Sequence, residues 1–139
     1  MKTAMILAAG RGDRLKPLTA MTPKALCVVK EKPLIEHHVM GLAKAGFERL
    51  VINHAYLGGK IRQHLGNGAR WGIEIYYSPE PPGGLETGGG IVNALPLLGD
   101  KPFITVNADI YTDFDFSQLQ PENTHSIHVI LVNKNPLLN

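Results

Sequence analysis

Short apolar runs alternate along this chain with segments that carry the spacing of an amphipathic helix, and this alternation is the strongest constraint on its fold. The apolar runs predict strands over 3–8, 50–53, 73–77, 103–107 and 127–132, with a short extended segment over 25–29. The helical spacing predicts helices over 33–46, over 57–65 and over 91–98, the last one broken near Pro96. Strands that alternate with helices form a mainly parallel sheet with helices on both faces, so we expect an α/β fold.

Composition and charge narrow the class of protein and of partner. With 139 residues, 44% of them hydrophobic and 19% charged, the chain is ordinary for one globular domain over 1–139. A net charge of +2 is too small to indicate a nucleic-acid or membrane partner. Cys27 is the single cysteine, which excludes an internal disulfide and fits the cytoplasm. No apolar stretch approaches the roughly 18 residues that span a membrane.

The segment that follows the first predicted strand is rich in glycine and in positive charge. Glycines at 10 and 12 allow a tight turn that brings backbone N–H groups close to an anion. A single acid, Asp13, stands among four cationic residues: Arg11, Arg14, Lys16 and Lys24. Two prolines stiffen the segment. Because open α/β sheets bind ligands beyond the carboxyl ends of their strands, we expect residues 9–24 to hold a triphosphate.

Two common phosphate-binding motifs do not fit this segment. A dinucleotide-binding fingerprint needs a third glycine where the chain has Leu15. It also needs an acid at the end of the second strand, where the chain has Asn53 and His54. A Walker-type loop needs Gly-Lys followed by Ser or Thr, whereas Lys24 follows a proline and precedes an alanine. From the residues alone, the remaining alternative is a basic surface turn that binds nothing.

Three motifs, in order along the chain, resemble the signature of the sugar nucleotidyltransferase family. The first is Leu7-Ala8-Ala9-Gly10-x-Gly12-x-Arg14-Leu15-x-Pro17-Leu18-Thr19, followed by Pro23-Lys24. The others are Leu85-Glu86-Thr87-Gly88-Gly89-Gly90 and Val106-Asn107-Ala108-Asp109. The resemblance covers essentially the whole chain. It implies a Rossmann-like, three-layer nucleotidyltransferase sandwich with a mainly parallel sheet, shortened at its C-terminus.

The first motif matches the family's grip on the nucleotide phosphates. The resemblance implies that the backbone of four residues wraps the phosphates: Ala9, Gly10, Gly12 and Asp13. Arg14 and Lys24 match the two basic residues at the reacting phosphate, which bind the nucleotide and act in catalysis. The role is physically sound, because fixed cations stabilise the charge that builds up on the leaving pyrophosphate.

The second motif resembles the family's nucleoside-contacting segment, and its implied nucleotide-binding residues are Glu86 and Gly88. Glycines there let the backbone approach a flat base closely. The alternative is a glycine-rich loop that ends in a helix capped by Thr87.

The third motif resembles the family's metal and sugar-phosphate site. Asp109 matches the metal aspartate, and a carboxylate at a strand end is well placed to hold Mg²⁺. Asn107, two residues earlier on the same side of the strand, matches a substrate-binding residue for the sugar phosphate. The family more often has glycine where this chain has Ala108, and we expect the extra methyl group to crowd the sugar.

The resemblance implies UTP as donor and N-acetylmuramate 1-phosphate as acceptor, as in cell-wall recycling, with pyrophosphate released. The alternatives are transfer from GTP to mannose 1-phosphate and a non-catalytic nucleotide-binding or regulatory domain. Family members continue beyond the fifth strand, where they carry a second metal-binding aspartate and part of the sugar pocket. We therefore expect weak or no turnover by the 139 residues alone, and self-association through the exposed edge of the fifth strand.

Overall fold

A four-stranded parallel sheet forms the centre of the protein. The computed structural model describes residues 2–9, 23–55, 58–81 and 85–118. The strands lie in the order β5-β4-β1-β6, and every neighbouring pair is parallel. Their bounds are Thr3–Leu7 for β1, Arg49–His54 for β4, Glu74–Pro79 for β5 and Phe103–Asn107 for β6. The predicted parallel α/β fold is confirmed.

Burial explains why the two central strands read as continuous apolar runs. In β1, Met5 and Ile6 are fully buried, and in β4 the three residues from Leu50 to Ile52 are fully buried as well. Such strands have helices on both faces, so their central residues are apolar on both sides. The edge strand β5 instead alternates, with Ile75 buried and Tyr76 exposed.

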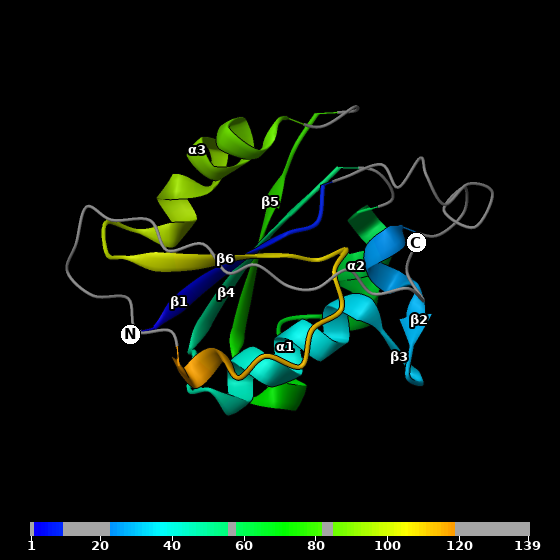
Figure 1. Cartoon of the computed structure of the whole chain (residues 1–139). Helices are drawn as coiled ribbons and strands as arrows, with labels where there is room; N and C mark the ends of the chain where they lie inside the picture. Colours follow the sequence, from blue (N-terminus) through cyan, green and yellow to red (C-terminus); the bar gives the residue numbers. More distant parts are fainter. Residues whose placement is uncertain (1, 10–22, 56–57, 82–84, 119–139) are drawn as a thin grey trace.

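Three helices cover the sheet and complete the predicted three layers. Helices α1 (Leu34–Lys44) and α2 (Gly58–Leu65) lie on one face and α3 (Thr87–Leu98) on the other, as Figure 1 shows. Ile6 and Ile52 pack into the core on the α1 and α2 side. Met5 and Val51 pack with Leu98 into a smaller core beneath α3. No helix within the described ranges is both long and apolar enough to cross a membrane.

Shorter elements complete the described chain. They are the 3-10 turns η2 (Lys24–Leu26), η3 (Ala69–Trp71) and η4 (Phe116–Gln118) and the two-stranded hairpin of β2 (Val28–Val29) and β3 (Lys32–Pro33). The extended segment predicted over 25–29 is thus extended only at its end. The fifth predicted strand, 127–132, lies outside the described residues, so self-association through its edge stays a prediction.

The prediction that the third helix breaks near Pro96 is wrong. Helix α3 continues to Leu98, and the Gly99 N–H donates to the Leu95 carbonyl at 3.0 Å, as in an unbroken last turn. Proline removes one helical hydrogen bond, the one to the Val92 carbonyl. Val92 and Pro96 are both exposed, so water can solvate that carbonyl in place of the missing donor.

The order of the strands creates a reversal point beside β1. The chain passes from β1 to β4 and β5 on one side of the sheet, then returns through α3 to β6 on the other side of β1. The chain leaves β1 towards one edge of the sheet and later adds β6 on the opposite side of β1, so the strand order reverses beside β1. Open α/β sheets bind their ligands at such a reversal, outside the carboxyl ends of the strands.

The first turn of α2 packs tightly against the end of β4. His54, the last residue of β4, accepts a hydrogen bond at Nε2 from Nε of Arg62 at 3.1 Å. A methyl group placed on Gly58 would lie 1.9 Å from Nδ1 of His54, whereas one placed on Gly59 would meet nothing within 4 Å. A glycine at 58 is therefore a condition for docking α2 on the sheet.

We predict that Gly58→Ala lowers the free energy of unfolding by about 1–3 kcal/mol, because the imidazole and the helix must move apart. The matched variant Gly59→Ala changes it by less than about 1 kcal/mol, since that position is open and alanine favours a helix. Urea denaturation of the two variants checks this. Equal stability of the two would contradict the packing.

Candidate functional site

Polar side chains stand at the carboxyl ends of the central strands. Leu7, the last residue of β1, is in register with Asn53 of β4 on one side and with Asn107 of β6 on the other. The Asn107 side chain is exposed, whereas Asn53 is only 3% exposed. Asn107 is therefore accessible to a ligand, whereas Asn53 belongs to the interior.

Lys24 and Asp109 meet at the reversal point between β1 and β6. Lys24 Nζ lies 3.6 Å from Asp109 Oδ2. The Lys24 side chain is 22% exposed and that of Asp109 is 53% exposed. An ion pair that is partly open to water adds little to stability. Solvent, and hence a ligand, can reach the Asp109 carboxylate and part of the Lys24 side chain.

Local structure fixes the position of Lys24. Pro23 is buried and extended, and η2 follows it directly. The Leu26 N–H donates to the Pro23 carbonyl at 2.9 Å, and Ala25 enters the main core with 4% exposure. The turn therefore holds the backbone of Lys24 against the core.

Asp109 sits in a turn that is tied to the end of β1. The Ala108 N–H donates to the Leu7 carbonyl at 3.0 Å, which extends the pairing of β1 and β6 by one bond. Ala108 is 1% exposed and packs in the core on the α1 side. Its methyl group points into the protein, so the expectation that it crowds a sugar is wrong.

A hydrogen-bonded chain joins β1, β4 and the segment before α3. The Ala8 N–H donates to Asn53 Oδ1 at 2.8 Å, and Asn53 Nδ2 donates to Glu80 Oε2 at 2.8 Å. The other carboxylate oxygen of Glu80 accepts the Leu85 N–H at 2.8 Å. Sequence reasoning missed both Asn53 and Glu80. The available signal was a polar residue at the end of an otherwise apolar strand.

Helix α3 begins at the surface of the protein. Glu86 occupies the N-cap position, and its side chain makes no capping hydrogen bond. Thr87 is the first helical residue, so the alternative in which Thr87 caps the helix is wrong. Gly88 is exposed and has open space around its α-carbon. Glu86 and Gly88 thus lie on the surface at the carboxyl edge of the sheet.

The predicted site residues divide into two groups. Six lie in described segments at the carboxyl edge: Ala9, Lys24, Glu86, Gly88, Asn107 and Asp109. The structure brings Lys24 and Asp109 into contact. The other four lie outside the described residues: Gly10, Gly12, Asp13 and Arg14.

The residues at this edge fit Mg²⁺ only together with a ligand's own oxygens. Within the described segments, no three His, Cys, Asp or Glu residues form a cluster that could hold a metal. Mg²⁺, however, is commonly bound through one or two carboxylates plus phosphate oxygens and water. The exposed carboxylate of Asp109 suits that arrangement.

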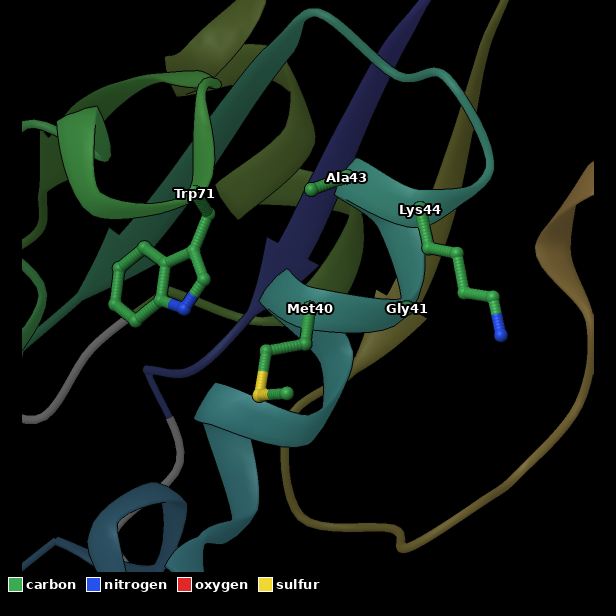
Figure 2. Close-up of a pocket in the computed structure, with 5 residues that line it drawn as sticks. All are labelled: Met40, Gly41, Ala43, Lys44 and Trp71. Atoms are coloured by element: carbon green, nitrogen blue, oxygen red, sulfur yellow. The ribbon is translucent and has the colours of Figure 1, made fainter.

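An open apolar pocket lies beside the C-terminal end of α1. Figure 2 shows its lining: Met40, Gly41, Ala43, Lys44 and Trp71. This end of α1 precedes β4, so it lies near the amino ends of the strands, and Ala45 accepts a hydrogen bond from Lys2 at the start of β1. The pocket is therefore separate from the site at the carboxyl edge.

Two buried histidines flank the site region. Burial lowers the pKa of His38, and the nearby backbone of Ile110 opposes this effect in part. Burial also lowers the pKa of His54, and the Arg62 guanidinium adds to the shift. Both imidazoles are therefore held in the neutral form in the folded protein.

Comparison with known proteins gives the relatives of this chain. A family model described as nucleotidyl transferase matches residues 3–132. An N-acetylmuramate alpha-1-phosphate uridylyltransferase of Neisseria meningitidis serogroup B is 60% identical over 114 residues, which cover 82% of this chain and 49% of that protein. A second one, of Caulobacter vibrioides, is 44% identical over 110 residues, covering 78% of this chain and 46% of that protein.

A solved structure agrees with the fold. HddC from Yersinia pseudotuberculosis superposes with a TM-score of 0.71 at 28% identity, over 85% of this chain and 52% of that chain. The chain thus spans about half the length of the curated relatives and of the solved structure that it matches.

The two histidines predict how stability depends on pH. A pKa that folding lowers means that the unfolded state binds the proton more tightly, so the stabilisation is present above the unfolded pKa of about 6.5 and is lost as the pH falls through the folded pKa. We predict a fall in the free energy of unfolding between about pH 7 and pH 5. In His38→Leu the fall is shallower. Urea denaturation at each pH measures both curves, and parallel curves would refute the role of His38.

Proposed function

The chain belongs to the nucleotidyl transferase family, and on that premise we propose that it binds a nucleoside triphosphate and transfers its nucleotidyl group to a sugar 1-phosphate, releasing pyrophosphate. The donor is UTP and the acceptor is N-acetylmuramate 1-phosphate. The observation that carries this proposal is the ion pair of the partly exposed Lys24 with the exposed Asp109, at the reversal point of the sheet. The similarity to two uridylyltransferases supports the choice of substrates.

The reaction joins two anions, and this sets the task of the site. An oxygen of the sugar phosphate attacks the α-phosphorus of the triphosphate, a new P–O bond forms, and the P–O bond to pyrophosphate breaks. Negative charge builds up on the leaving pyrophosphate. We assign Lys24 and Arg14 to the stabilisation of that charge, because fixed cations act before and during the transfer without reorganising.

Other residues hold the reactants. Asp109 would bind Mg²⁺, which neutralises phosphate charge when it is bound. The backbone of Ala9 and of the residues that follow it would hold the triphosphate, with Glu86 and Gly88 against the nucleoside. Asn107 is exposed beside Asp109 and would donate its amide to the sugar phosphate.

The setting of the reaction follows from its substrates. N-acetylmuramate is a cell-wall sugar, so we assign the protein to cell-wall recycling. We place it in the cytoplasm, where nucleoside triphosphates are made, and we treat residues 1–139 as one nucleotide-binding domain. Because the chain spans about half the length of its relatives, binding of UTP is the first property to test.

We predict that Lys24→Ala weakens the affinity for UTP in the presence of Mg²⁺ by roughly tenfold or more, because a charge-assisted contact to phosphate is lost. Lys44→Ala is the matched control, since Lys44 lines the pocket at the opposite end of the sheet. Isothermal titration calorimetry measures the affinities, and circular dichroism checks the fold of both variants.

The outcome of this titration separates the alternatives. Equal UTP affinity of Lys24→Ala and the unsubstituted chain would contradict the role of Lys24. Tighter binding of GTP than of UTP would favour transfer to mannose 1-phosphate. UTP binding without pyrophosphate release over a panel of sugar 1-phosphates would favour a nucleotide-binding role for these residues.

A further inference from the structure

Asn53 is buried, and both the oxygen and the nitrogen of its side-chain amide form hydrogen bonds. Its oxygen accepts the Ala8 N–H at 2.8 Å, and its nitrogen donates to Glu80 Oε2 at 2.8 Å. Asn53 itself is 3% exposed. A backbone N–H can only donate, and an ionised carboxylate can only accept, so the two neighbours fix the orientation of the amide.

Glu80 extends this chain to the segment that leads into α3. Its second oxygen accepts the Leu85 N–H at 2.8 Å, and its own N–H donates to the His54 carbonyl at 2.9 Å. Leu85 lies directly before Glu86. Three consecutive hydrogen bonds therefore connect Ala8, which follows β1, with Leu85, two residues before the start of α3.

Helix α3 closes over the pair of Asn53 and Glu80. A methyl group on Gly90 would lie 2.7 Å from Glu80 Oε2 and 2.9 Å from Asn53 Nδ2. Contacts this short leave no space for any side chain at 90. The backbone of α3 at Gly90 therefore packs directly against the two hydrogen-bonded side chains and leaves them little room to move.

We propose that Asn53 is a positioning residue for the nucleotide site. Through its amide it holds the start of the segment after β1 at a fixed separation from the segment before α3. The inference rests on the proposed function, in which the first segment binds the triphosphate and the second the nucleoside. One UTP molecule contacts both segments, so its affinity depends on their separation being set before it binds.

An exchange of amide and carboxylate tests this role. In Asn53→Asp the contact with Ala8 is kept, but two carboxylates face each other at the position of the second hydrogen bond. In Asn53→Asp with Glu80→Gln, the glutamine nitrogen can donate to the aspartate while its oxygen accepts the Leu85 N–H. The double variant therefore rebuilds all three hydrogen bonds with the two groups exchanged and the net charge unchanged.

A matched control separates this effect from added charge. Asn93 of α3 is also an amide near β5, and its nitrogen donates to Ser78 Oγ at 3.2 Å and to the Pro79 carbonyl at 3.1 Å. Asn93→Asp adds the same negative charge in the same part of the fold. The experiment is calorimetric titration of UTP with Mg²⁺ into the 139-residue chain and its variants, with urea denaturation in parallel.

We expect Asn53→Asp to weaken UTP binding about tenfold more than Asn93→Asp, the size of effect typical of one lost buried hydrogen bond. Glu80→Gln has its own effect, and adding Asn53→Asp to it should change the affinity by less than about threefold.

Two results would overturn the inference. The first is an effect of Asn53→Asp on UTP affinity that is the same with Glu80 and with Gln at 80, because the two positions would then act independently. The second is that Asn53→Asp has a lower free energy of unfolding but binds UTP as tightly as Asn93→Asp. Asn53 would then have a structural role alone. If Asn53→Asp does not fold, the test is the UTP affinity of the double variant compared with that of Glu80→Gln. A tenfold weaker affinity of the double variant contradicts the proposal.

Failure of the proposed function gives a different result. If the unsubstituted, folded chain binds no UTP, the proposed function falls and this inference with it. If UTP binds and the Asn53 variants match Asn93→Asp, this inference falls alone.

Discussion

Parallel pairing of four strands is the constraint on which the rest of this structure depends. Because β1, β4, β5 and β6 all run in one direction, their carboxyl ends meet at one edge. The segments that follow these strands are far apart in the sequence and are brought together there. The contact of Lys24 with Asp109, 85 positions later in the numbering, is a direct product of this pairing.

The site combines two kinds of polar residue with opposite physical demands. Asp109 is exposed and Lys24 is partly exposed, so their ion pair contributes little to folding. Asn53 is buried, so its hydrogen bonds must be satisfied within the protein. In the site that we propose, the charges contact the ligand and the buried amide holds the neighbouring segments in place.

The sequence predicted the sheet well because the central strands are buried on both faces and appear as unbroken apolar runs. It failed at Pro96, where exposure of the last helical turn allows a proline that burial would have excluded. Lys24 and Asp109 could be named as candidates because each belongs to a compact motif, and the structure brings the two into contact. Asn53 and Glu80 could not, because their contact depends on the packing of α3 through Gly90, which no local pattern encodes.

The direction of β1 also separates the two ends of the molecule. The strand runs from Thr3 towards the edge that carries Lys24 and Asp109, and five residues at about 3.3 Å each carry the chain roughly 16 Å. Lys2 therefore lies at the opposite end of the sheet. A label attached to the Lys2 side chain would leave the edge with Lys24 and Asp109 unobstructed.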